Sequence, residues 1–184
     1  MKELYRQIEI QMKQAVDHLH QELKTLRTGR ASLSMLDGVT VEYYGTPTPL
    51  NQLANLSVAD ATLITAQPYD STQIPSIEKA IRSSDLGLNP SNDGRMIRIP
   101  VPPLTEERRK EFVKIAHDMA EQTRNVIRQA RRDGNDQLKK MEKDKEISQD
   151  DEKRGHDEMQ KLHDHYIGEI NEALKTKEKQ ILEG

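Results

Sequence analysis

The sequence predicts an α+β protein, in which an elongated three-helix bundle carries a small inserted α/β domain. All eight prolines lie between Thr46 and Leu104. A proline inside a helix costs about 3 kcal/mol, so long helices are expected only outside this window. Outside it, apolar residues recur every three or four positions, whereas inside it several stretches alternate apolar and polar residues. We therefore expect a bundle formed by residues 1–30 and 105–184 and a small domain formed by residues 31–104.

Three apolar stripes predict the helices of the bundle. Residues 2–29 form the first helix, which Gly29 ends, with the stripe Ile8, Met12, Ala15, Leu19, Leu23 and Leu26. Residues 106–147 form the second, after Thr105 as N-cap, with the stripe Phe112, Ile115, Met119, Thr123, Val126, Ala130, Leu138 and Met141. Residues 149–182 form the third, capped by Ser148, with the stripe Met159, Leu162, Tyr166, Ile170, Ala173, Leu174 and Ile181. Three such helices suffice to close a bundle within one chain, and a dimeric coiled coil is the alternative.

The middle of the chain follows a shorter pattern. Alternation over residues 39–44 predicts a strand, with turns at Asp37-Gly38 and Gly45-Thr46-Pro47. Further strands are expected at 63–69 and 96–101, with a weaker one at 53–58. A short amphipathic helix is expected at 74–84, with Pro75 in its first turn, and residues 89–94 form a loop rich in turn-forming residues.

The chain passes twice between the two predicted domains, near Arg30 and again near Pro102. Two short connections form a natural hinge, because only a few dihedral angles need to change to reorient the small domain. Pro102 and Pro103 restrict one connection, whereas Gly29 leaves the other permissive. The predicted hinge residues are Arg30, Ala31, Pro102, Pro103, Leu104 and Thr105.

Composition excludes several classes of protein. The 184 residues contain no cysteine and no tryptophan, so a disulfide framework and a thiolate metal site are both excluded. No apolar run is long enough for a membrane span or a signal peptide, and we expect a cytoplasmic protein. The pair His163 and His165 cannot chelate one ion on a helix, because residues two apart point in opposite directions. No catalytic motif is present, and we expect neither enzymatic activity nor a cofactor.

The charge is unevenly distributed along the chain. The net charge is −3, yet residues 105–147 carry twelve Lys and Arg against ten Asp and Glu. Four arginines at offsets 0, 4, 7 and 8 share one side of the second helix, with no acidic residue between Gln122 and Arg132: Arg124, Arg128, Arg131 and Arg132. On the first helix, Lys24 and Arg27 lie on another basic face. Guanidinium groups match phosphate oxygens, so these residues predict binding to folded RNA; a solvated face with scattered ion pairs is the alternative.

Long stretches of the sequence resemble the ribosome recycling factor family. They run from end to end of the chain: 26–32, 36–38, 41–50, 78–81, 84–90, 102–110, 131–133 and 144–148. The resemblance implies a three-helix bundle with a small inserted α/β domain, L-shaped like tRNA. Gly134 departs from the family pattern, and with Gly155 and Gly168 it is expected to weaken its helix by roughly 1 kcal/mol relative to alanine.

The resemblance also implies a function that composition cannot supply. Family members, together with elongation factor G, split the post-termination ribosome into subunits and release mRNA and tRNA. The bundle would lie on large-subunit ribosomal RNA at the intersubunit face, with Arg128 and Arg131 as expected contacts and Arg132 beside them. The small domain would reach toward the small subunit and the elongation factor, and the factor would act as a monomer. The competing interpretation is a coiled-coil interaction protein whose arginines are merely solvated.

Overall fold

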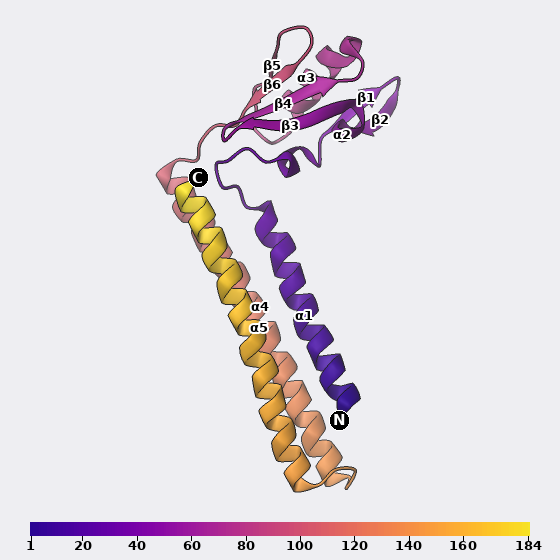
Figure 1. The fold of residues 1–184 in the computed structure, drawn as a ribbon, viewed down its shortest axis with the longest axis vertical. Helices are drawn as coiled ribbons and strands as arrows, with labels where there is room; N and C mark the ends of the chain where they lie inside the picture. The colour runs from indigo at the N-terminus through magenta and orange to yellow at the C-terminus, as the bar shows by residue number, and fades with distance from the viewer. The chain divides into compact units, whose positions relative to one another are not determined.

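The computed structural model describes residues 1–184, which form two compact units. One unit contains Met1–Arg27 and Glu106–Glu183, and the other contains Thr28–Thr105 and Gly184. The first unit consists of three long helices, α1 (Lys2–Thr25), α4 (Glu106–Lys143) and α5 (Gln149–Glu183), which lie side by side (Figure 1). The helix α1 runs parallel to α5 and antiparallel to α4, so the amino end of α1 lies beside the turn between α4 and α5 (Figure 1). The predicted α+β class with three long helices is confirmed.

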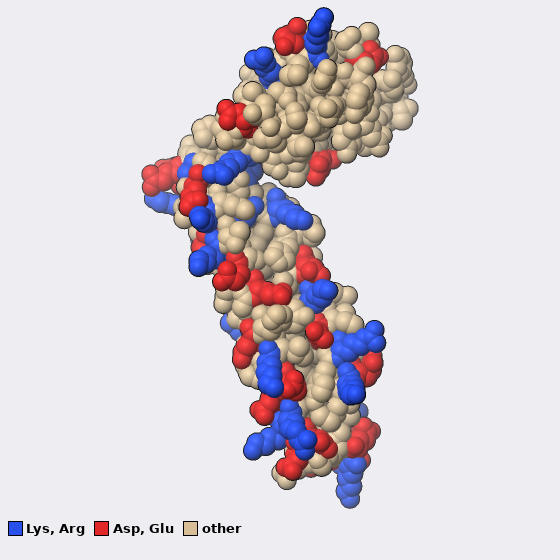
Figure 2. Space-filling view, viewed as in Figure 1, with Lys and Arg blue, Asp and Glu red and all other residues tan.

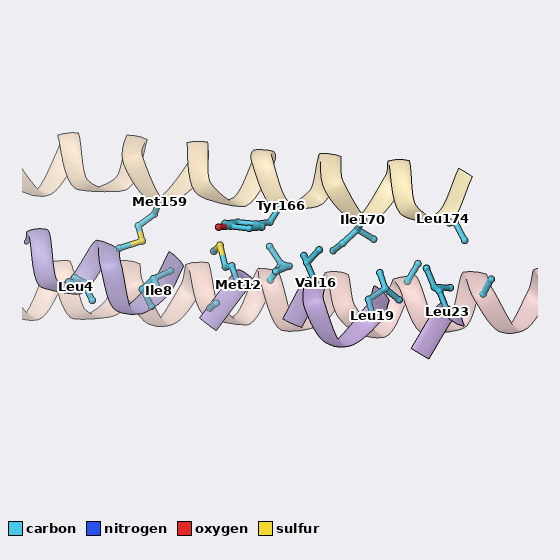
Figure 3. Packing of buried hydrophobic residues seen from close by; sticks show 14 of the residues in the cluster. Leu4, Ile8, Met12, Val16, Leu19, Leu23, Met159, Tyr166, Ile170 and Leu174 are labelled. Atoms are coloured by element: carbon cyan, nitrogen blue, oxygen red, sulfur yellow. The ribbon is translucent and has the colours of Figure 1, made fainter. Parts of the chain in front are cut away.

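The three helices bury one continuous apolar seam (Figure 3). Leu19, Ile127 and Ile170 are fully buried in it, one from each helix. The predicted stripes are largely confirmed, but the prediction that Val126 faces the core is wrong. Val126 is 44% exposed, and Ile127 is buried in its place. The helix α4 packs against both α1 and α5. Its buried face, outside which Val126 lies, therefore includes small residues that allow close packing: Ala116, Ala120, Ala130 and Gly134.

Two glycines that the sequence marks as weak points allow close helix packing. A Cβ atom on Gly134 of α4 would lie 2.6 Å from the Met159 sulfur on α5. Reciprocally, a Cβ atom on Gly155 of α5 would lie 2.7 Å from a methyl carbon of Leu138 on α4. Each helix thus receives a side chain of the other where a glycine stands, which brings the two backbones close together. The helix α4 continues through Gly134 without a break.

Gly168 lies in open space, and replacing it with alanine is expected to stabilise the protein. Apart from the surrounding backbone of its own helix, nothing lies within 4 Å of the place where its Cβ would stand. The substitution therefore keeps the packing and gains about 0.4–1 kcal/mol from helix propensity and reduced unfolded-state entropy. Denaturation by urea measures the change. Gly155→Ala is the contrasting variant, since Leu138 must move there, and a larger gain at Gly155 than at Gly168 would contradict this explanation.

The first helix ends four residues earlier than predicted. The Thr25 hydroxyl donates to the Glu22 carbonyl at 2.7 Å, the acceptor that the Leu26 N–H would use if the helix continued. The Leu26 N–H bonds the Leu23 carbonyl instead, and Leu26 takes an extended conformation with φ −77° and ψ 128°. Gly29, with φ +80°, therefore lies outside the helix and is not its C-terminal cap.

The turn between α4 and α5 is also set locally. The helix α4 stops at Lys143 and not at 147, because Lys145 adopts a left-handed conformation with φ 59° and the Glu146 N–H reaches back to the Met141 carbonyl. Ser148 caps α5 as predicted: its hydroxyl accepts from the Asp151 N–H at 3.1 Å and donates to the Asp151 carboxylate at 2.7 Å.

The second unit contains two antiparallel sheets and two short helices. The first sheet pairs β1 (Thr40–Tyr43) with β2 (Thr46–Pro49). The second has the order β3-β4-β6-β5, from β3 (Ala54–Asp60), β4 (Leu63–Pro68), β6 (Ile97–Pro100) and β5 (Ser91–Asn92). The helices are α2 (Leu50–Leu53) and α3 (Ile74–Ser83), with 3-10 turns at Leu33–Leu36 and Ser71–Gln73. The core joins the sheets to Ile74, Ile77 and Ile81 of α3.

The four predicted strands and the short helix are confirmed, and the sequence does not predict three further elements, β2, α2 and β5. The segment containing Pro47 and Pro49 forms β2, not only a turn, with Glu42 opposite Pro47. Proline is tolerated there because a two-stranded sheet has only edge strands. The turn itself is Tyr44-Gly45, with φ 47° and 81°. The helix α2 and strand β5 are too short to leave a periodic pattern.

Candidate nucleic-acid interface

The four predicted arginines all lie on α4, and we call Arg124, Arg128, Arg131 and Arg132 the arginine surface. The structure links the first two through one carboxylate. Glu121 accepts from Arg124 at 3.0 Å and from Arg128 at 2.7 Å. These hydrogen bonds, that of Arg128 first, lower the pKa of the Glu121 carboxyl below its usual value. Glu121 therefore cancels part of the charge that the sequence assigns to this surface.

Arg124 and Arg131 also reach across to α5. Arg124 donates to the Asn171 side-chain oxygen at 2.8 Å, and its side chain is only 18% exposed. Arg131 donates to the Gln160 side-chain oxygen at 2.6 Å, and its Nε is buried without a hydrogen-bond partner. Both side chains thus stiffen the contact between α4 and α5 as well as presenting positive charge.

Arg132 is exposed, and its side chain makes no hydrogen bond or ion pair. It is the member of the arginine surface whose whole guanidinium remains open to a ligand. Charges of both signs are interspersed over the face of the helices seen in Figure 2. On the arginine surface, Arg124 and Arg128 form ion pairs with Glu121. Arg131 and Arg132 form no ion pair with a carboxylate.

The basic residues predicted on the first helix lie elsewhere. Lys24 lines a groove between α1 and α5, whose other lining residues include Asp164, Glu169 and Glu172. Arg27 lies two residues beyond the end of α1, so the helical offset that placed it on one face with Lys24 does not hold. No hydrogen bond or ion pair joins Lys24 to the arginine surface.

The predicted hinge residues lie where both connections are tied to a single turn of the small unit. The Ala31 N–H donates to the Ala61 carbonyl at 2.7 Å, and the Val101 N–H donates to the Thr62 carbonyl at 2.8 Å. Ala61 and Thr62 form the turn between β3 and β4. A Cβ on Gly29 would lie 3.3 Å from the Leu104 nitrogen, so the two connections run side by side. Beyond these anchors only short segments remain, residues 26–30 and 102–105.

Sequence reasoning missed the partners that hold the arginines. Glu121 stands three residues before Arg124 and seven before Arg128, a helical spacing that predicts the ion pairs, but it lies just before the stretch from Gln122 to Arg132 that contains no acidic residue. Gln160 and Asn171 belong to another helix, so no local spacing could reveal them. The structure shows no arrangement of three or more His, Asp or Glu side chains fit to hold a metal ion. No helix combines the length and the apolar character that a membrane span requires.

Comparison with known proteins identifies the family. The model of the ribosome recycling factor family matches residues 19–182. A relative named ribosome-recycling factor from Natranaerobius thermophilus is 52% identical over 98% of both chains. Another relative of that name, from Oleidesulfovibrio alaskensis, is 54% identical over 95% of both.

Solved structures agree over the whole length. A solution structure of ribosome recycling factor has a TM-score of 0.76 at 40% identity and covers 100% of this chain and 97% of its own. A second structure has a TM-score of 0.64 at 44% identity and covers 98% of each chain. It is described as models for the T. thermophilus ribosome recycling factor and the E. coli elongation factor G bound to the E. coli post-termination complex. The sequence matches and the similarity of the whole fold to solved structures point to one family. The chain belongs to the ribosome recycling factor family.

Proposed function

We propose that this chain is a non-enzymatic ribosome recycling factor of the cytoplasm. Acting as a monomer with elongation factor G, it splits the post-termination ribosome into subunits and releases mRNA and tRNA. The helical unit binds large-subunit ribosomal RNA at the intersubunit face through the arginine surface of α4. The relative described with elongation factor G on a post-termination complex supports this assignment of partners.

One observation carries the RNA-binding part of the proposal. Arg131 and Arg132 stand next to each other on a continuous helix, and neither is paired with a carboxylate. Guanidinium groups held on a rigid helix can each donate two parallel hydrogen bonds to phosphate oxygens. Backbone phosphates are the accessible charged groups of folded RNA, and such contacts fix the position of a protein on it without reading sequence.

Salt titration tests this binding mode. With about four phosphate contacts, the logarithm of the affinity for large ribosomal subunits should fall with the logarithm of salt concentration at a slope of roughly −3 to −4. Between 50 and 200 mM salt this amounts to about a 100-fold loss of affinity. The measurement is binding of labelled protein to isolated large subunits at constant magnesium. A slope near zero would instead favour the coiled-coil interpretation, in which apolar helix contacts dominate and the arginines are solvated.

We also propose that the two connections act as the hinge through which the small unit moves relative to the helices: Arg30, Ala31, Pro102, Pro103, Leu104 and Thr105. The anchors at Ala61 and Thr62 support this assignment, since they leave only short segments to absorb a rotation. Force on the small unit must pass through these segments to reach the helices between the subunits. If a connection were too flexible, a force on the small unit would bend the connection and would not move the helices.

Loosening the stiff connection should separate binding from splitting. Pro102→Gly combined with Pro103→Gly releases about 1–2 kcal/mol of backbone restraint in that segment. We expect near-parental binding to large subunits, because the arginine surface is unchanged, and a lower rate of subunit splitting with elongation factor G. Both are measured on the same preparation, with Pro47→Gly in β2 as a control for loss of a proline elsewhere. Equal loss of both activities, or loss of neither, would contradict the mechanical role.

A further inference from the structure

Arg131 is held differently from its neighbours. Glu121, which is charged, binds Arg124 and Arg128, whereas Gln160, which is neutral, binds Arg131. A carboxylate that holds an arginine also cancels its charge. An amide oxygen fixes the guanidinium without placing a carboxylate in direct contact with it, so more of its positive charge remains available to a phosphate.

A carboxylate on the same helix, that of Asp164, fixes the orientation of the Gln160 amide. Its nitrogen donates to the Asp164 carboxylate at 2.8 Å, one helical turn further along α5. His163 contacts the same carboxylate oxygen at 2.9 Å. The hydrogen bonds from His163 and then Gln160, and the nearby charge of Arg131, lower the pKa of the Asp164 carboxyl below its ordinary value. An aspartate is ionised at neutral pH even at its ordinary pKa. An ionised Asp164 can only accept, so the amide nitrogen must face it and the amide oxygen must face Arg131.

The helix packing brings this network to the arginine. Met159, the residue before Gln160, fills the space left by Gly134, which lies three residues after Arg131. This close approach puts the Gln160 oxygen 2.6 Å from Nη1 of Arg131 and buries Nε against α5. Nη2 has no hydrogen-bond partner and remains accessible to solvent. The contact with α5 therefore holds the side chain in place and leaves Nη2 for a ligand.

From this arrangement we infer that Gln160, oriented by Asp164, is a positioning residue that presets Arg131 of the arginine surface for an RNA phosphate. The inference rests on the proposed function. An arginine that is already fixed loses less conformational entropy when it binds, and ordering a long side chain otherwise costs affinity. The surface that recognises RNA would thus depend on α5, a helix whose own residues need not touch the RNA.

The test compares two substitutions by methionine, one that removes a hydrogen-bond acceptor and one that removes a charge. Gln160→Met keeps the length of the side chain but cannot accept a hydrogen bond, so Arg131 remains charged and becomes mobile. We expect a loss of about three- to tenfold in affinity for isolated large ribosomal subunits, with an unchanged salt slope, because no charge is removed. Arg131→Met removes the charge itself and should lower the magnitude of the salt slope by about one. In the Arg131→Met background, Gln160→Met should cause no further loss.

Gln129→Met is the matched control. Gln129 is also an exposed helical glutamine that donates to an aspartate four residues later, Asp133, at 2.7 Å, but its side chain forms no hydrogen bond with an arginine. It should bind like the parent, and thermal melting should show that all these variants are folded. Asp164→Ala, which frees the amide to rotate, should give a smaller loss than Gln160→Met and provides a second variant.

The outcomes are distinguishable. If Arg131→Met weakens binding and Gln160→Met does not, the positioning role is wrong and the proposed function stands. If Gln160→Met weakens binding equally with and without Arg131, Gln160 acts through some other contact and the inference is again overturned. If Arg131→Met leaves binding unchanged, both the arginine surface and its positioning fail together.

Discussion

Replacing Ile170 with alanine is expected to lower the free energy of unfolding of the helical unit by about 2–5 kcal/mol. Ile170 on α5 is fully buried in the apolar seam, where it faces residues of both other helices (Figure 3). The substitution removes buried methyl and methylene groups and leaves a cavity that long, regularly packed helices cannot readily close. Since a domain of this kind has about 5–15 kcal/mol of stability in total, the loss is a large share of it.

Urea denaturation followed by far-ultraviolet circular dichroism, a signal dominated by the three long helices, measures this effect. Leu19→Ala, at a fully buried position on α1, should give a loss of similar size. Ile10→Ala is the control: Ile10 lies on α1 with 45% exposure, and its truncation should change stability by less than about 0.5 kcal/mol. If both core variants unfolded at the same urea concentration as the parent, the three stripes would not share one core.

Replacing Arg128, Arg131 and Arg132 together with methionine is expected to reduce binding to large ribosomal subunits by about 1,000-fold or more. Each charge-assisted hydrogen bond contributes about 1.5–3 kcal/mol, so three lost contacts amount to at least about 4.5 kcal/mol if they act independently. Methionine retains the apolar stem of each side chain. The substitution also leaves Arg124 as the one basic partner of Glu121, so the net positive charge of the surface is lost.

A control must remove the same charge elsewhere on the helical unit. Arg154, Lys161 and Lys179 are exposed on α5 and make only pairs within their own helix. Their combined replacement with methionine should leave binding close to that of the parent, apart from a small general loss of electrostatic attraction. Equal losses in the two triple variants would show that overall charge, and not the arginine surface, governs binding.

The helices were predictable because the signals that form them are local. Periodic leucine and isoleucine positions on α1, the Ser148 cap of α5 and Pro75 in the first turn of α3 act within a few residues, so they can be read in order along the chain. The ends of the helices were less predictable. Whether α1 stops at Thr25 or at Gly29 depends on which donor takes the Glu22 carbonyl, and the sequence alone offers both the Thr25 hydroxyl and the Leu26 N–H.

By itself the sequence determined the fold class, the three helical stripes and the row of arginines on α4, because each follows from spacing along one segment. The tertiary structure alone decided what the glycines and the arginines do. Gly134 and Gly155 are unfavourable in an isolated helix, yet each admits a side chain of the neighbouring helix. Arg131 meets a neutral amide because Gln160, 29 residues away, is brought beside it by that packing. Such contacts depend on which faces of distant segments meet, and periodicity within one segment contains no information about them.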